Sequence, residues 1–202
     1  MMMHLMKKFH VRILLIAIAL STGCQNGGGG GETADQLVKD GWGAYASKSY
    51  RSAVSKFNQA ISMDGNLTDA YNGAGWSYAQ LSILDTSVVK FTAGRMHDSA
   101  NTEINAGLGI VENALKAYTA SLQFAGTALQ KNPAWTFSRD NTVNWSDLQL
   151  LLAEDFYALS LYDSSLVHVK TLNASFTADV STFAGQKLLS QEIELLRSLY
   201  GS

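Results

Sequence analysis

The sequence predicts an all-α fold in which helical hairpins stack one after another and a last helix covers the open end. The main observation is a pattern that occurs twice at a 34-residue interval: Gly41-Trp42 recurs as Gly75-Trp76, and Phe57 recurs as Phe91. Between these residues the apolar positions follow the period of an α-helix. Repeats of this length are typical of solenoids in which each pair of helices buries its apolar face against its neighbours.

Composition supports one sizeable core and excludes one class of partner. The chain has 202 residues, of which 47% are apolar and only 16% are charged, well below the roughly 25% of an average globular chain. Three of the fifteen basic residues precede Cys24, so a chain that begins there carries 12 basic and 17 acidic side chains, a net charge of 12 − 17 = −5. Since nucleic-acid binding depends on clustered Lys and Arg, we expect no nucleic-acid partner.

Residues 1–23 are predicted to be an export signal. Lys7-Lys8 precede an apolar run, Val11–Leu20, which ends in the small residues before Cys24. The run is too short to cross a bilayer, which takes about twenty helical residues. The ending resembles the lipobox of bacterial lipoproteins, although Ser21 stands where Leu is usual. The resemblance implies a lipid on Cys24; ordinary secretion with a chance cysteine, or a short uncleaved anchor, remain the alternatives.

Residues 24–32 are predicted to be a flexible tether. Five consecutive glycines, Gly27–Gly31, lack the strand, helix and Lys or Ser/Thr that a phosphate-binding loop requires. About nine residues of such chain span roughly 15–18 Å, which would hold the folded part close to a membrane. Gln25 follows the cysteine where Asp would favour retention in the inner membrane, so the lipoprotein resemblance implies the outer membrane.

The domain at 33–202 is predicted to begin with three helical hairpins in one register. The first resembles the tetratricopeptide repeat (TPR) and matches its pattern at Gly41, Ala53, Phe57 and Ala60. The second carries Tyr71, Ala74, Gly75, Tyr78 and Phe91, but has Ser87 and Gly94 where alanines are usual; the third carries Gly109, Tyr118, Ala128 and Pro133. We expect the glycines at 41, 75 and 109 to mark close helix crossings where a Cβ would push the helices apart.

The rest of the domain departs from this register. The polar stretch Arg95–Asn105 is expected to be a loop between the second and third hairpins. A fourth hairpin is expected at Asp147–Ser175, with Tyr162 following Tyr118 by 44 residues instead of 34, and the extra residues fall in Ala134–Asn144. A last amphipathic helix at Gly185–Tyr200 is expected to cap the stack. The resemblance thus implies a TPR-like α-solenoid of three to four repeats with a C-terminal capping helix.

No catalytic or metal-binding pattern is present, so we expect neither an enzyme nor a cofactor. His97, Asp98 and Glu103 match no known ligand spacing. His168 lies between two valines and is expected to be a structural imidazole. Glu154-Asp155 are adjacent, but consecutive helical side chains point about 100° apart and share a proton poorly.

Tryptophans are the strongest candidates for a binding surface. In TPR arrays the residue after the hairpin glycine tends to face the concave groove, which implies this place for Trp42 and Trp76, on a wall shared by Val38, Tyr45 and Asn72. Aromatic rings are common anchors of interfaces, but a role in filling the core is equally open. In the insertion, Trp135 and Phe137 are expected to fold back onto the scaffold, joined by Trp145, although a binding role for Trp135 stays open.

These features favour a non-enzymatic adaptor, lipid-anchored in the bacterial cell envelope, that binds a segment of another envelope protein on its concave face. The alternative is a surface-exposed lipoprotein that binds glycans or other small ligands, with Trp42, Trp76 and Trp135 as stacking platforms.

Overall fold

The computed structural model describes residues 32–200, so the predicted signal peptide, Cys24 and nearly all of the tether lie outside the described residues. Within this range the chain forms nine α-helices and a single isolated β-bridge, between Thr136 and Asn144. The helices are α1 (Ala34–Ala46), α2 (Tyr50–Met63), α3 (Thr68–Gln80), α4 (Leu84–His97), α5 (Thr102–Ala114), α6 (Tyr118–Lys131), α7 (Trp145–Ala158), α8 (Tyr162–Leu172) and α9 (Phe183–Tyr200).

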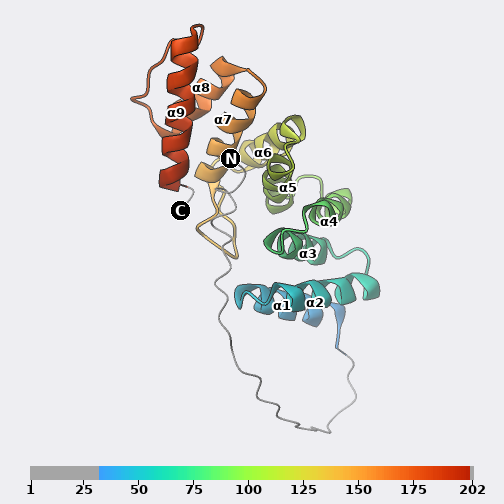
Figure 1. Cartoon of the computed structure of the whole chain (residues 1–202). Coiled ribbons are helices and arrows are strands. Elements are labelled where there is room, and N and C mark those ends of the chain that lie inside the picture. Colours follow the sequence, from blue (N-terminus) through green and yellow to red (C-terminus); the bar gives the residue numbers. More distant parts are fainter. Residues whose placement is uncertain (1–31, 201–202) are drawn as a thin grey trace.

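Consecutive helices pair as four hairpins, and α9 packs on the last one against α7 and α8. Figure 1 shows the hairpins following one another along an arc, with α1 and α2 at one end and α8 and α9 at the other. The odd-numbered helices α1, α3, α5 and α7 also contact one another in sequence and form one continuous wall. The predicted all-α solenoid, its fourth hairpin and its capping helix are therefore confirmed.

The four hairpins turn in the same way although their turn residues differ. Each turn has one non-glycine residue with positive φ, at Lys48, Ser82, Lys116 and Ser160, with φ between 58° and 63°. In each turn the following amide N–H donates to the carbonyl five residues back, as from Ser49 to Ala44 and from Leu161 to Phe156. The spacing of 34, 34 and 44 residues places the fourth hairpin in line with the other three.

The glycine prediction is confirmed, and phenylalanine rings supply the reason in the first two hairpins. A Cβ on Gly41 would lie 2.7 Å from the Phe57 ring, and a Cβ on Gly75 would lie 2.5 Å from the Phe91 ring. A second set, Gly73 and Gly107, again 34 residues apart, is not part of the repeat pattern, and a Cβ on either would overlap one of the same two rings. Each ring thus fills a socket between two hairpins and is fully buried.

The serines that depart from the repeat pattern have a structural role. Ser87 donates a hydrogen bond of 2.8 Å to the carbonyl of Gly75, and Ser121 donates one of 2.9 Å to Gly109. Ser165 does the same to Ala153 at 2.7 Å. All three hydroxyls are buried, so each joins the two helices of its hairpin by a hydrogen bond that water does not reach.

The stretch Arg95–Asn105 is not a loop, which corrects the expectation. Helix α4 continues to His97 and α5 begins at Thr102, so only residues 98–101 connect them. The side chain of Asn101 caps α5 by accepting a hydrogen bond of 3.0 Å from the amide of Ile104. Arg95 and Asn105 face each other across the connection, with Nε donating to Oδ1 at 3.1 Å. The polar residues stabilise the helix ends and do not interrupt the helices.

Candidate functional site on the concave face

The wall formed by α1, α3, α5 and α7 lies on the inner side of the arc in Figure 1, and we call it the concave face. Register identifies its equivalent positions. Trp42 corresponds to Trp76 and Ile110 at intervals of 34 residues, and the 44-residue interval of the fourth hairpin then places Glu154 in the same row. The row therefore changes from aromatic on the first two hairpins to acidic on the fourth.

The aromatic part of this face is covered. Trp42, Tyr45, Asn72 and Trp76 expose 6%, 4%, 3% and 1% of their surface, and Val38 is half-buried. The indole N–H of Trp42 donates to Asp69 Oδ2 at 2.9 Å. These residues lie on α1 and α3, which form part of the wall, but none of the four buried side chains is open to a ligand in this structure.

The cover is the segment between α6 and α7, which we call the loop and define as residues 132–144. Figure 1 shows it extending from α7 along the inner side of the arc toward α1. The Phe137 ring stacks on Trp76 with centroids 4.2 Å apart and makes edge contacts with Trp42 and Tyr45 at 6.4 and 6.0 Å. The guanidinium of Arg139 lies 4.5 Å above the Trp42 ring. The loop thus fills the groove with an aromatic and a cationic side chain.

Of the three aromatic residues expected to fold back onto the scaffold, two are buried and one is not. Trp135 and Phe137 are 2% and 1% exposed, which confirms the expectation for both. Trp145 is 36% exposed and does not join them, because it begins α7 and donates only its backbone N–H, to the Trp135 carbonyl at 2.7 Å. With all three indoles at 42, 76 and 135 buried, none presents a free face as a stacking platform.

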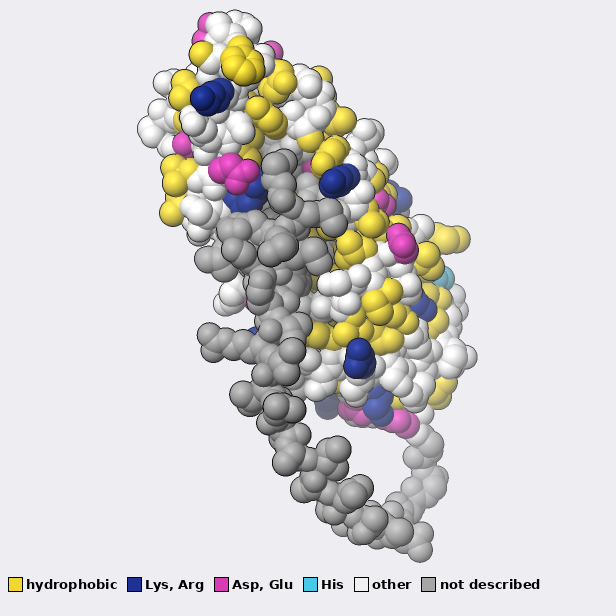
Figure 2. Space-filling model, viewed as in Figure 1, with side chains coloured by type: hydrophobic (Ala, Val, Ile, Leu, Met, Phe, Trp, Pro, Cys, Tyr) yellow, Lys and Arg dark blue, Asp and Glu magenta, His cyan; other side chains and the backbone are white. Residues whose placement is uncertain are grey.

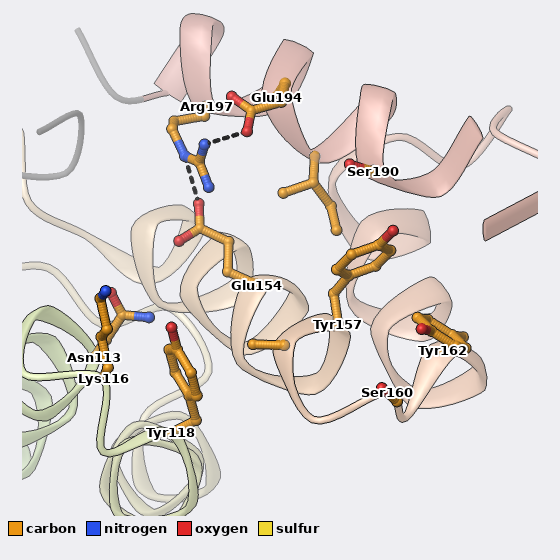
Figure 3. Close-up of a pocket in the computed structure, with 12 residues that line it drawn as sticks. Asn113, Lys116, Tyr118, Glu154, Tyr157, Ser160, Tyr162, Ser190, Glu194 and Arg197 are labelled. Atoms are coloured by element: carbon orange, nitrogen blue, oxygen red, sulfur yellow. Dashed lines mark hydrogen bonds and ion pairs between the residues drawn. The ribbon is translucent and has the colours of Figure 1, made fainter. Parts of the chain in front are cut away.

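At the other end of this wall, a cavity of about 540 Å³ lies between α7, α9 and the turns that join α5 to α6 and α7 to α8. We call this cavity the open pocket. It lies where the acidic end of the wall meets the capping helix (Figure 3). Most of its lining side chains are polar or aromatic: Asn113, Lys116, Tyr118, Glu154, Tyr157, Ser160, Tyr162, Ser190, Glu194 and Arg197. In Figure 3 the hydroxyl of Tyr118 points toward the side where Glu154 and Arg197 lie.

One arginine organises the charges of the open pocket. Arg197 Nε donates to Glu154 Oε1 at 2.9 Å and Nη1 donates to Glu194 Oε1 at 2.6 Å. The side chains of Arg197 and Glu154 are only 9% and 13% exposed. Burial raises the pKa of Glu154, against the opposing effect of the Arg197 guanidinium. The exposed Lys116 has no ion-pair partner among the described residues, so the pocket holds one cation that a ligand could pair.

The neighbouring carboxylates at 154 and 155 have separate surroundings, as their helical positions predict. Asp155 is fully buried and accepts a hydrogen bond of 2.7 Å from Asn113 Nδ2. Burial raises the pKa of Asp155 to about 7, although the hydrogen bond from Asn113 opposes the rise. The pair therefore does not form a shared acid–base site.

The two histidines of the described chain are packed against aromatic rings. His97 stacks on Tyr71 with centroids 5.6 Å apart, and His168 stacks on Phe156 at 5.3 Å and hydrogen-bonds Gln149 at 2.7 Å. Burial lowers the pKa of His168, which favours a neutral, structural ring. Within residues 32–200 no three His, Cys, Asp or Glu side chains lie close enough to hold a metal ion.

Charge on the surface is sparse. On the face in Figure 2, the Lys and Arg side chains of the described residues are scattered between uncharged and apolar groups. No helix in the described range is long and apolar enough to span a membrane.

Comparison with known proteins supports the fold. The chain matches no family model and no curated protein sequence. It is similar in structure to MamA from Desulfovibrio magneticus RS-1, at 12% identity and a TM-score of 0.61, over 71% of this chain and 76% of that one. A TPR protein from Parabacteroides merdae gives 14% and 0.60, over 84% and 62%. The first TPR domain of human RPAP3 gives 15% and 0.52, over 62% and 97%. The chain therefore has a TPR-like fold.

Proposed function

We propose that this protein is a non-enzymatic interaction scaffold whose concave face binds a segment of another protein. The TPR-like solenoid supports this function, because stacked hairpins present an extended, curved surface suited to binding. The observation that carries the proposal is the open pocket. It includes Glu154, which continues the row of Trp42, Trp76 and Ile110. It also offers uncovered hydroxyl groups and Lys116, which has no ion-pair partner in the described part of the chain.

A photo-crosslinker placed in the open pocket tests this proposal. We expect a full-length variant with benzoylphenylalanine in place of Tyr157 to crosslink a discrete partner when irradiated in cells. The matched control carries the same group at Met96 on α4, which is 83% exposed and is not part of the concave face. A partner captured equally at both positions, or at neither, would count against the pocket.

The envelope location is part of the proposal and rests on the sequence alone. The signal-like residues 1–23 and Cys24 support export and lipidation, and Gln25 supports the outer membrane, so the partner is expected to be another envelope protein. Labelling cells with a radioactive fatty acid should mark the wild-type chain and not the Cys24→Ala variant. Equal labelling of both would rule out a lipid on Cys24.

Binding of a glycan or other small ligand is a second candidate. It is favoured by the pocket volume of about 540 Å³, which is within the range of small-ligand sites, and by the half-buried Tyr118, Tyr157 and Tyr162. A glycan array would separate the two candidates. Specific binding that is lost in Tyr157→Ala, with no protein crosslinked at that position, would favour the small ligand.

A further inference from the structure

The loop binds the aromatic part of the concave face as a separate ligand would. It contacts three helices of the wall: Phe137 touches α1 and α3, and the amide N–H of Ser138 donates to Glu103 Oε1 on α5 at 3.1 Å. Between Asn132 and Asn144, only Trp135, Phe137 and Val143 are buried, and most other residues are exposed. A short segment that contacts the wall through one aromatic ring, Phe137, and a main-chain hydrogen bond, with most of its other residues exposed, resembles a bound peptide.

Hydrogen bonding under the loop is incomplete. Trp76, which Phe137 covers, and Asn72 one turn earlier on α3 are 1% and 3% exposed, and Trp76 Nε1 and Asn72 Oδ1 have no hydrogen-bond partner among the described residues. Buried polar groups are usually satisfied. One donor and one acceptor on adjacent turns of α3 are groups that the C=O and N–H of a bound peptide could pair. The wall therefore has one hydrogen-bond donor and one acceptor that the loop does not pair.

Charge defines the side chain that should follow the aromatic anchor. Arg139 lies over the Trp42 ring, whose N–H is bound by the carboxylate of Asp69, and Glu103 lies on the adjacent helix α5. A cation over an indole is attracted to its face, and the two carboxylates favour the same charge. Phe137 and Arg139 are separated by one residue, so the wall selects an aromatic residue followed two positions later by a basic one.

We propose that the wall of Trp42, Tyr45 and Trp76 is a binding site for a segment of another protein that forms a turn like that of Phe137–Asp140, where the Asp140 N–H donates to the Phe137 carbonyl at 3.2 Å. This segment has an aromatic residue followed, two positions later, by Arg or Lys, and the loop occupies the site until such a segment displaces it. When the partner's aromatic ring replaces the Phe137 ring, the contacts to Trp42, Tyr45 and Trp76 are made again by the new ring. Because the loop competes at the high effective concentration of a tethered group, the affinity for the partner is reduced by the fraction of molecules in which the loop is closed. This site is separate from the open pocket.

The test uses the full chain and a fluorescein-labelled peptide with the sequence of residues 133–144. We expect weak binding to the wild type and binding at least about tenfold tighter to Phe137→Ala, in which the loop has lost its anchor. A peptide with Ala in place of its Phe should not bind. Removal of the peptide's Arg should weaken binding about two- to fivefold. A folded Phe137→Ala protein that binds no better than the wild type would overturn the proposal.

A second variant covers the case in which Phe137→Ala fails to fold. Arg139 is exposed, so Arg139→Ala should keep the fold and should raise the affinity for the peptide about two- to fivefold. Trp42→Phe in the same variant should reverse much of this gain, because the indole face is the cation's binding surface. No gain in Arg139→Ala would overturn the proposal. Size-exclusion chromatography tests whether the occupant is instead a second copy of this chain. If the wild type is a dimer and Phe137→Ala is a monomer, the proposal of a segment from another protein is contradicted.

Discussion

Single glycines determine how closely the hairpins pack, and two neighbours on α1 allow a controlled test. In Gly41→Ala the new Cβ meets the Phe57 ring, whereas in Gly43→Ala it meets nothing within 4 Å. We expect Gly41→Ala to lower the free energy of unfolding by about 1–3 kcal/mol, because the buried ring cannot move aside. Gly43→Ala should raise it by up to about 1 kcal/mol through better helix propensity. Urea denaturation of both variants checks this; equal effects would contradict it.

The buried carboxyl of Asp155 should make stability depend on pH. Its folded pKa of about 7 exceeds the ordinary value of 3.8, so between these values the folded state binds more protons than the unfolded state. The free energy of unfolding should therefore fall as pH rises from about 4 to about 7, by up to about 4 kcal/mol. Asp155→Asn, which keeps an acceptor for Asn113, should remove this fall.

Urea midpoints at pH 4 and pH 8 measure the effect. Asp155→Asn should match the wild type at pH 4 and exceed it at pH 8. Asp163→Asn, an exposed residue in the first turn of α8, serves as control and should follow the wild type at both values. A wild-type profile that Asp155→Asn leaves unchanged would contradict this assignment.

At the scale of single residues, a position can be predicted from the sequence when its residue type has one physical use in a helix. The glycines at 41, 75 and 109 repeat in register, and a helical glycine in register points to a close approach. Gly73 and Gly107 also repeat at 34 residues but were missed, because the family pattern does not include them. Ser87 departs from the repeat pattern, and the role of its hydroxyl is visible only in the structure, where it lies beside the carbonyl of Gly75.

At the scale of elements, the capping helix α9 depends on a buried ion pair as well as on its apolar stripe. Arg197→Met leaves the carboxylate of Glu154 buried without its cation, so we expect the free energy of unfolding to fall by roughly 3 kcal/mol. Lys187→Met on the same helix removes an exposed charge that has no ion pair within residues 32–200 and should change little. Amide hydrogen exchange should show the loss first in α9.

A double variant separates the charge from the packing. If the cost in Arg197→Met comes from the unpaired carboxylate, Arg197→Met combined with Glu154→Leu should recover most of the lost stability, since apolar replacement of both partners is often neutral. Additive losses would instead assign the cost to packing of the arginine stem.

Helix order, hairpin pairing and the capping helix could all be predicted, because the apolar period and the repeat length are local properties of the sequence. The connection between α4 and α5 is shorter than the polar stretch Arg95–Asn105 predicts and comprises only residues 98–101. The polar side chains around it cap a helix or hydrogen-bond across the connection. The site was predictable only in part. Register places Trp42 and Trp76 on one wall, but contact between Phe137 and that wall joins residues 137 − 76 = 61 and 137 − 42 = 95 positions apart, and no local pattern reports such a contact.

At the scale of the whole molecule, the loop links hairpins that are not neighbours. Solenoid stability is normally a sum of terms within and between adjacent repeats, whereas Phe137 connects the segment before α7 to α1 and α3. In Phe137→Ala we expect amide protection to fall in α1 to α3 by roughly 2–4 kcal/mol and to stay unchanged in α8 and α9. Phe183→Ala, at an 82% exposed residue, should leave both regions unchanged. A uniform loss along the chain would contradict this linkage.

The same loop has a consequence for synthesis on the ribosome. Trp42 leaves the exit tunnel 95 residues ahead of Phe137, and at about 5–20 residues per second this interval lasts roughly 5–20 s. During that time the first two hairpins can form from local contacts, but their aromatic wall has no cover. Nascent chains of this protein should therefore expose a hydrophobic surface that chaperones can bind until the loop emerges. Translation pauses between positions 76 and 137 should increase the tendency of these nascent chains to aggregate.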